Sequence, residues 1–346
     1  MKAARLYGPG DLRIEEVPDP VASPGWAVVR VEACGVCPSD TRVYNGSRRA
    51  GAPWTPGHEV AGVVASTVGG VAPDAMPPGA RVAVDWRSVC GVCYYCRRGD
   101  ANFCERRRDF PIAGFAELTS VPEDVLHPLS DSLSFSAASF CEPLACVLNA
   151  HRSLPPALGS DVVVVGAGAI GLLHLQVAVH RGARVIVADL LPERLAAARR
   201  LGAAASINVS DLDPVAAVKD LTGGRGANTV IVAVGSAAVA ETAIDMACKG
   251  GAVNLFAGFH PPTTLNLDPN LIHYNQVTLT GSHDYGPGEF ATALRLLENG
   301  TVCVEPMVTG HYALHDIRLA FEATDTHQGL KSIVHPNGLS RTEEAK

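Results

Sequence analysis

Long apolar runs, aromatic residues and excess positive charge are all scarce in this chain of 346 residues. The longest apolar run covers 12 residues, 162–173, and contains three glycines, whereas a membrane-spanning helix needs about 20 residues. Residues 1–10 also lack the apolar core of a signal peptide. We therefore expect a cytoplasmic protein with no membrane segment.

The charge and the composition exclude further classes of protein. The formal net charge is −7, so no overall basic field exists to attract nucleic acid or an acidic membrane surface. Hydrophobic residues reach 47%, which excludes a disordered chain and a coiled coil. The length suggests two domains.

Two different patterns follow each other along the chain. Residues 1–150 contain short β-branched runs bounded by glycine and proline, which predicts a β-rich domain. From about residue 158, strands alternate with helices, and this alternation is typical of a parallel sheet covered by helices. We expect strands at 162–165, 184–189, 230–234, 253–256 and 277–281, and helices ending at His180 and spanning 192–201, 239–248 and 288–299.

The predicted fold class is therefore α/β, with a β-rich domain and a doubly wound parallel-sheet domain. We place the β-rich domain at 1–150 and the parallel-sheet domain at 151–283. Residues 284–346 return to the first domain and end in a polar tail from Asn337 onward.

A glycine loop follows the first strand of the second domain. Gly166, Gly168 and Gly171 fit G-x-G-x-x-G, with Ala169 and Ile170 between the last two glycines. The first glycine permits a tight turn, the second lets the backbone approach a pyrophosphate, and the third allows close helix–strand packing. The helix N-terminus then faces the anion.

An acidic residue strengthens the prediction of a dinucleotide site. Asp189 ends the next strand, 18 residues after Gly171, where a carboxylate would bind a ribose 2′-hydroxyl and repel a 2′-phosphate. We therefore expect NAD rather than NADP. Arg194 is a candidate for the adenine ribose, although a solvated helix arginine is an equal alternative.

Four of the ten cysteines form a compact C-x2-C-x2-C-x7-C cluster, Cys90, Cys93, Cys96 and Cys104. Four thiolates at such spacing suit a tetrahedral zinc ion, and they leave no coordination position open, so this zinc would be structural. An iron–sulfur cluster or free thiols are the alternatives. The acidic chain argues against a nucleic-acid-binding zinc module.

A second candidate metal site combines Cys37 with His58, about 20 residues later. On two turns of a β-rich domain, these side chains would converge on one ion. A catalytic zinc needs three protein ligands and one open position. Either Glu59 or Glu142 would supply the third ligand.

Together these residues resemble a zinc-dependent member of the medium-chain dehydrogenase/reductase superfamily, and the resemblance covers nearly the whole chain. Residues 142–146 (EPLAC) and 268–274 (DPNLIHY) are similar to the sorbitol/L-iditol 2-dehydrogenase group of polyol and sugar dehydrogenases. The resemblance implies a GroES-like catalytic domain, a structural zinc lobe at about 88–106 and a Rossmann-type NAD domain.

The resemblance also implies the roles of individual residues. Cys37, His58, Glu59 and Glu142 belong to the catalytic zinc site, where zinc lowers the pKa of the substrate hydroxyl. Ser39 passes the proton outward. Many relatives have a histidine five residues after the zinc cysteine as the end of this relay. This chain has Arg42 instead, which cannot deprotonate in a protein.

The function expected from the resemblance is hydride transfer between NAD and a secondary alcohol of a small polyol, sugar or cyclitol. Two zinc ions per chain and a homodimer or homotetramer are implied, with strand 277–281 extending the sheet across subunits. A threonine or simple secondary-alcohol dehydrogenase is the nearest alternative, and aromatic residues are few for an aromatic-lined alcohol pocket. A non-catalytic dinucleotide-binding relative would be expected to have lost zinc ligands.

Overall fold

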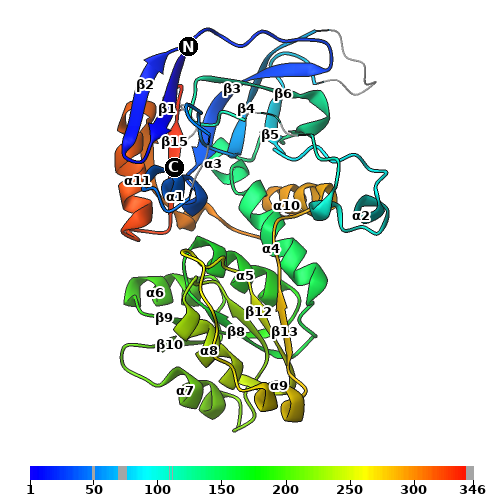
Figure 1. Ribbon diagram of the computed structural model, residues 1–346, viewed down its shortest axis with the longest axis vertical. Helices are drawn as coiled ribbons and strands as arrows, with labels where there is room; N and C mark the ends of the chain where they lie inside the picture. The colour runs from blue at the N-terminus through cyan, green and yellow to red at the C-terminus, as the bar shows by residue number, and fades with distance from the viewer. Residues whose placement is uncertain (49–50, 69–75, 109, 111, 340–346) are drawn as a thin grey trace. The chain divides into compact units, whose positions relative to one another are not determined.

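The computed structural model describes residues 1–48, 51–68, 76–108, 110, 112 and onward to 339. The chain divides into two compact units, and the first is discontinuous (Figure 1). Unit 1 contains Met1–Ala145 and Tyr285–Lys346, and unit 2 contains Cys146–Asp284. The division at Ala145 falls inside one helix, so no change of composition marks it. Of the predicted polar tail, residues 340–346 lie outside the described residues.

Unit 1 is built on two β-sheets. A seven-stranded sheet has the order β14-β15-β3-β4-β5-β7, with β6 paired to β3, and a separate pair joins β1 to β2. All of these pairings are antiparallel except β14 with β15. The strands are β1 Lys2–Gly8, β2 Asp11–Glu16, β3 Trp26–Gly35, β4 Glu59–Thr67, β5 Arg81–Val84, β6 Leu118–Pro122, β7 Leu126–Pro128, β14 Val308–Ala313 and β15 Lys331–His335.

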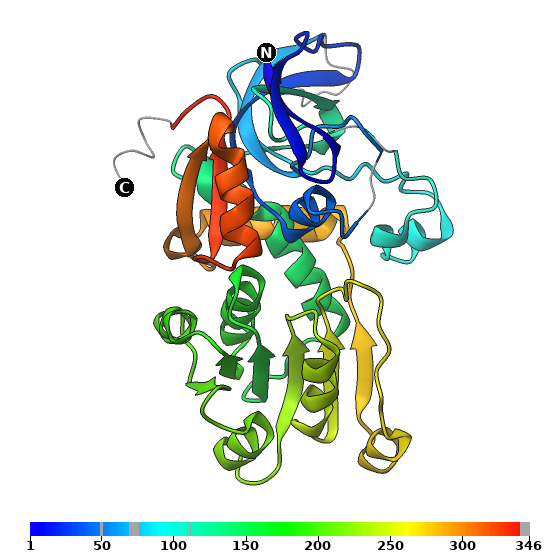
Figure 2. The ribbon, with the colours of Figure 1, turned by 60° about the vertical axis from the view of Figure 1, so that its left-hand side comes forward.

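The helices of unit 1 are mostly short. Helix α11 packs against β15 and β14, as Figure 2 shows, and its Phe321 and Ala320 are fully buried. The helices are α1 Pro38–Tyr44, α2 Tyr94–Arg97, α3 Phe135–Ala138, α10 Pro287–Glu298 and α11 Ile317–Asp325, and the 3-10 turns are η1 Ala101–Phe103, η2 Glu123–Val125, η3 Glu305–Met307 and η4 Leu314–Asp316. Helix α4, Cys141–Ser153, begins in unit 1 and ends in unit 2.

Unit 2 has a six-stranded parallel sheet with the order β10-β9-β8-β11-β12-β13. The order reverses between β8 and β11, and right-handed crossovers then place helices on both faces. The strands are β8 Asp161–Val165, β9 Arg184–Asp189, β10 Ala205–Asn208, β11 Ala227–Val232, β12 Ala247–Leu255 and β13 Thr278–Gly281, and the helices are α5 Ala169–His180, α6 Pro192–Arg200, α7 Pro214–Leu221, α8 Ala237–Asp245 and α9 Pro269–Asn275. The predicted α/β class, with a β-rich domain and a parallel-sheet domain, is confirmed.

Several predicted boundaries in unit 2 are wrong. The helix expected at 239–248 ends at Asp245, and Cys248 lies in β12, where Ala247 pairs with Ala227 of β11. Pairing with a neighbouring strand overrides the helical pattern of that segment. Strand β10 and helix α7 were not predicted from the sequence.

Valine-rich strands form the core of each unit. In unit 2, Val163 of β8, Val230 of β11 and Val253 of β12 are all fully buried, as expected for a parallel sheet covered on both faces. Among the described residues, no helix has both the length and the apolar character needed to cross a membrane.

Candidate catalytic, structural-metal and cofactor sites

The four clustered cysteines converge in a lobe of unit 1 that contains α2 and η1. Their sulfur atoms all lie within 4.8 Å of one another. The Sγ atoms of Cys90 and Cys96 are 4.0 Å apart, and so are those of Cys93 and Cys104. Four thiolates around one zinc ion, with bonds of about 2.3 Å, would place sulfur atoms about 3.8 Å apart.

Backbone amides of this lobe donate hydrogen bonds to its sulfur atoms. The amide of Cys90 donates to Sγ of Cys104 at 3.3 Å, and the amide of Cys93 donates to Sγ of Cys90 at 3.4 Å. Backbone donors, first that of Cys96, lower the pKa of Cys93 to about 6, whereas burial raises the pKa of Cys96 to about 12. The sulfur spacing and the donor set therefore fit a zinc ion.

Cys37, His58 and Glu59 form the second cluster, and their ligand atoms also lie within 4.8 Å of one another. The pairing of β3 with β4 explains this convergence, because Gly35 near the end of β3 lies opposite Glu59 at the start of β4. Cys37 follows β3 as the N-cap of α1, and His58 immediately precedes β4. Cys37 and His58, 21 positions apart in the sequence, thus meet at one end of the sheet.

Asp40 contacts both segments that form this cluster, the turn at Cys37 and the turn at His58. Its carboxylate accepts hydrogen bonds from the amides of Cys37 and Gly57, both at 3.3 Å. Its Oδ1 also lies 3.5 Å from Nδ1 of His58. Burial opposes protonation of His58, but Asp40 and then Cys37 outweigh it and raise the pKa of the imidazole well above its usual value.

Lys331 of β15 is buried beside Glu59. Its ammonium donates to Oε1 of Glu59 at 2.7 Å and to the carbonyl of Val36 at 3.0 Å. Burial raises the pKa of Glu59 against the opposing effect of Lys331. The carboxylate fits only because residue 35 is glycine, since a Cβ there would lie 2.0 Å from Oε2 of Glu59.

Glu142 lies near this cluster but is not among the three grouped residues. It stands in the first turn of α4, and its Oε1 accepts a hydrogen bond from Nε1 of Trp86 at 3.3 Å. The ring of Trp86 lies 5.6 Å from that of His58. Trp86 and Lys331 were not predicted as site residues, because no spacing pattern in the sequence links either residue to the metal-ligand pairs.

Ser39 lies beside Cys37. Its hydroxyl donates to Sγ of Cys37 at 3.2 Å, and its amide lies 3.5 Å from the same sulfur. Sγ of Cys37 therefore accepts two hydrogen bonds from Ser39. Arg42 is half-buried on the same helix, α1.

In unit 2, the glycine loop joins β8 to α5 as a tight turn. Gly166 has a φ of 100°, and a Cβ at Gly171 would lie 1.7 Å from the carbonyl oxygen of Gly166. Gly168 is the N-cap of α5, and Ala169 and Ile170 begin that helix. The backbone amides at this N-terminus are available to an anion.

Asp189 at the end of β9 holds the glycine loop in place. Its Oδ2 accepts a hydrogen bond from the amide of Ala167 at 2.6 Å, and its Oδ1 accepts one from Leu191 at 2.8 Å. Arg194 on α6 reaches the same loop, because its Nη1 lies 3.8 Å from the position of a Cβ on Gly168. The loop, the acid and the arginine therefore lie together within unit 2.

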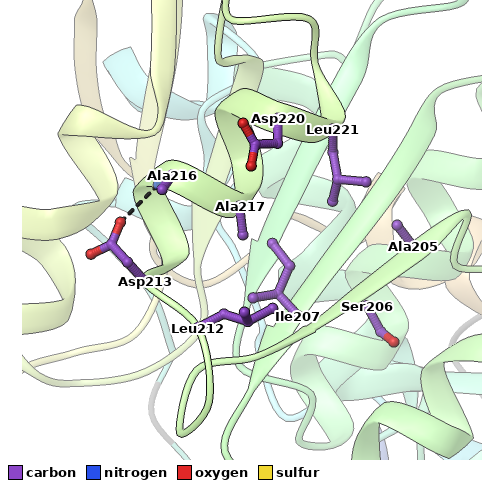
Figure 3. A pocket seen from close by; sticks show the side chains of 9 residues that line it. All are labelled: Ala205, Ser206, Ile207, Leu212, Asp213, Ala216, Ala217, Asp220 and Leu221. Atoms are coloured by element: carbon purple, nitrogen blue, oxygen red, sulfur yellow. Dashed lines mark hydrogen bonds between the residues drawn. The ribbon is translucent and has the colours of Figure 1, made fainter.

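A separate hollow of about 360 Å³ lies at the far edge of the unit 2 sheet, between β10 and α7 (Figure 3). Its lining is mainly apolar, with Leu212 and Ile207 beside Asp213 and Asp220. None of the predicted site residues lines it.

Comparison with known proteins identifies both units. Residues 23–131 match the alcohol dehydrogenase GroES-like domain, and residues 169–299 match the zinc-binding dehydrogenase family. Sorbitol dehydrogenase of Halalkalibacterium halodurans is 31% identical over 95% of this chain and 97% of its own length.

Solved structures agree with this similarity. A dehydrogenase of Sinorhizobium meliloti, determined with NADP, superposes with a TM-score of 0.89 at 29% identity over 97% of this chain and 99% of its own. An alcohol dehydrogenase of Escherichia coli CFT073, determined with NADH, gives a TM-score of 0.87 at 27% identity with the same coverage.

The fold and the two domains define a zinc-type alcohol dehydrogenase. The chain belongs to the zinc-dependent medium-chain dehydrogenase/reductase superfamily, within which it resembles the sorbitol dehydrogenases. Zinc and a nicotinamide dinucleotide are the cofactors of this class.

Proposed function

We propose that this chain is a zinc-dependent, NAD-linked dehydrogenase that interconverts a secondary alcohol and a ketone on a polyol, sugar or cyclitol. The observation that carries the proposal is the convergence of Cys37, His58 and Glu59 in a chain that also has a dinucleotide-type glycine loop. The similarity to sorbitol dehydrogenase supports a polyhydroxylated substrate.

Cys37, His58 and a carboxylate would hold the catalytic zinc in this proposal. Zinc in such a site supplies a Lewis acid, which makes a substrate hydroxyl more acidic. The grouping of Glu59 with Cys37 and His58 favours Glu59 as the third ligand, whereas its ion pair with Lys331 competes for the same carboxylate. Glu142 is the second candidate. Cys90, Cys93, Cys96 and Cys104 would hold the structural zinc.

Ser39 is proposed to move the substrate proton away from the site. Its hydroxyl lies 3.2 Å from Cys37, next to the proposed position of the reacting hydroxyl. Arg42 cannot accept a proton, because a guanidinium remains charged. The proton would therefore pass from Ser39 to water.

We propose NAD as the preferred cofactor, bound at Gly166, Gly168, Ala169, Ile170 and Gly171. Each oxygen of Asp189 accepts one backbone hydrogen bond, and a carboxylate oxygen has a second lone pair for a ribose hydroxyl. The negative charge of Asp189 disfavours a 2′-phosphate. Arg194 beside the loop is proposed to contact the adenine ribose.

The rate of NADH formation tests the proposed function. Zinc-loaded protein would be assayed against alditols, aldoses, inositols, threonine and simple alcohols, with NAD and then with NADP. We expect turnover of a polyhydroxylated class with NAD. Turnover of threonine or simple alcohols alone would contradict the proposed substrate class, and turnover with NADP alone would contradict the role of Asp189.

We also propose a cytoplasmic homodimer or homotetramer. All ten cysteines are free of disulfides, as expected for thiols kept reduced to bind metal. Strand β13 pairs with β12 and stands at the end of its sheet in the described part of the chain, so a second copy could extend the sheet there. Light scattering that gives a monomer mass would contradict the oligomer.

A further inference from the structure

Trp86 lies beside His58 and Glu142, two candidate ligands of the catalytic zinc. Its Nε1 donates to Oε1 of Glu142 at 3.3 Å, and the centre of its ring lies 5.6 Å from that of His58. An indole has a single N–H donor, which points in one direction from a rigid ring. The position of the Trp86 ring therefore determines how the carboxylate of Glu142 is turned beside His58.

Asp85 and Arg87 close a tight turn around Trp86. Asp85 directly follows β5, and its amide donates to the carbonyl of Val125 at 2.9 Å. Its Oδ1 accepts a hydrogen bond from the backbone amide of Arg87 at 3.0 Å. A hydrogen bond from the amide two residues later to an aspartate side chain is an Asx turn, which constrains the backbone of the residue between them. In this chain, that residue is Trp86.

Tyr285 reaches the same turn from a distant part of the chain, although both segments belong to unit 1. Its hydroxyl donates to Oδ1 of Asp85 at 3.0 Å, and its side chain is fully buried. Its ring lies 5.9 Å from that of Phe290 on α10. Asp85 is only 2% exposed, so hydrogen bonds within the protein hold its carboxyl group. The acceptor that closes the turn is therefore itself fixed by Tyr285.

Stacking holds the side chain of Trp86 as well. Cζ of Arg87 lies 4.0 Å from the centre of the Trp86 ring and 5.2 Å from that of Tyr285. Cζ of Arg107 lies 5.7 Å from the Trp86 ring. A guanidinium close to an aromatic face is attracted to it. Tyr285 is thus connected to Trp86 by two routes, through the hydrogen bonds of Asp85 and through the stacked Arg87.

The turn needs an oxygen acceptor at residue 85 rather than a negative charge. Burial raises the pKa of Asp85 to about 7, against the opposing effects of the Arg87 amide and the Tyr285 hydroxyl. A protonated carboxyl group keeps an acceptor oxygen, and the side-chain amide of asparagine has one too. Asparagine at this position would therefore preserve the turn, whereas leucine would abolish it.

We propose that Asp85 and Tyr285 are positioning residues of the candidate catalytic site, which hold Trp86 against Glu142 and His58. This inference rests on the proposed function, because the orientation of Glu142 affects the reaction only where it faces a metal ion and its substrate. Neither Asp85 nor Tyr285 contacts the reacting atoms. Loss of either would let the indole move, and the carboxylate of Glu142 would then turn.

Cobalt in place of zinc gives a readout that does not depend on turnover, because the visible absorption of Co²⁺ changes with the arrangement of its ligands. The band that disappears in Cys37→Ser belongs to the catalytic site. We expect Tyr285→Phe and Asp85→Leu to shift this band, and Asp85→Asn to leave it as in the wild type. Tyr7→Phe is the matched control, because it removes another bond from a tyrosine hydroxyl to a carboxylate, that to Glu15 at 2.9 Å.

Steady-state kinetics test the same variants in the zinc-loaded protein. In Tyr285→Phe, kcat/KM for the best alcohol should fall about tenfold, which is the effect expected from one lost hydrogen bond. KM for NAD should stay within about twofold of the wild type, because the glycine loop belongs to unit 2. Asp85→Leu should lose activity in the same way, and Asp85→Asn should keep most of it.

An unchanged cobalt band and an unchanged kcat/KM in Tyr285→Phe and Asp85→Leu would overturn the inference and leave the proposed function intact. Equal effects in Asp85→Asn and Asp85→Leu would also overturn it, because the acceptor oxygen would then have no role. The same holds for equal effects in Tyr7→Phe and Tyr285→Phe. A wild type that shows neither turnover nor a cobalt band dependent on Cys37 would instead overturn the proposed function itself.

Discussion

At the scale of single residues, buried charges surround the candidate catalytic cluster, and each has an identified neighbour. Glu59 is paired with Lys331, and Asp40 is paired with the loop amides and His58. A buried ion pair contributes little when complete, but loss of one partner leaves an uncompensated charge. The Glu59–Lys331 pair therefore contributes to the stability of the folded protein and also holds Glu59 in its position in the cluster.

Lys331→Met should destabilise the protein by about 3–5 kcal/mol, because the buried carboxylate of Glu59 loses its cation. Urea unfolding of the chelator-treated protein measures this difference, because no zinc ion then compensates the charge of Glu59. Lys331→Arg, which keeps the charge, should recover part of the loss. Lys249→Met on the surface is the control and should change stability by less than about 0.5 kcal/mol. A stability for Lys331→Met within about 1 kcal/mol of the wild type would contradict the role of the pair.

At the scale of secondary-structure elements, α4 and α5 meet through two buried histidines. Nε2 of His151 lies 3.1 Å from Nδ1 of His174, and the two rings are stacked. Burial lowers the pKa of His151 to about 3 and that of His174 well below its usual value. Both imidazoles are therefore neutral in the folded protein near neutral pH.

This pair predicts a specific loss of stability in acid. An unfolded histidine has a pKa of about 6.5, so below that pH the unfolded chain binds protons that the folded pair does not. Stability is present above pH about 6.5 and falls as the pH drops from there toward the folded value. At pH 5 the loss is about 2 kcal/mol for His151 alone.

Denaturant unfolding at pH 7.5 and pH 5 measures this effect. The decrease between the two pH values should be smaller by about 2 kcal/mol in His151→Asn than in the wild type. His180→Asn, an exposed position at the end of α5, is the matched control and should behave like the wild type. Identical decreases in His151→Asn and wild type would show that the pair does not titrate as described.

The secondary-structure elements also show which parts of the fold can be predicted from local sequence patterns. The glycine loop and the strand that ends at Asp189 have strong local signals, and both appear in the structure close to the expected residues. The end of α8 and the strand β10 depend on pairing with distant strands, so local patterns misplace or miss them.

At the scale of the whole molecule, the two-domain class followed from the change of pattern near residue 158 and from the metal-ligand spacings. The residues that local patterns could not reveal come from distant segments. Lys331 reaches Glu59 across 272 positions, and Tyr285 reaches Asp85 across 200. Only the fold brings such pairs together, which is why Trp86, Lys331 and the arginines near Trp86 were absent from the predicted site.

The most direct test of the central claim is the rate of NADH formation as zinc is returned to chelator-treated protein. The substrate would be the best one found in the panel, with NAD in excess. We expect that removal of accessible zinc abolishes turnover, that zinc restores it, and that Cys37→Ser cannot be restored. A full rate in zinc-free protein, or an unchanged rate in Cys37→Ser, would contradict a zinc-dependent dehydrogenase centred on Cys37 and His58.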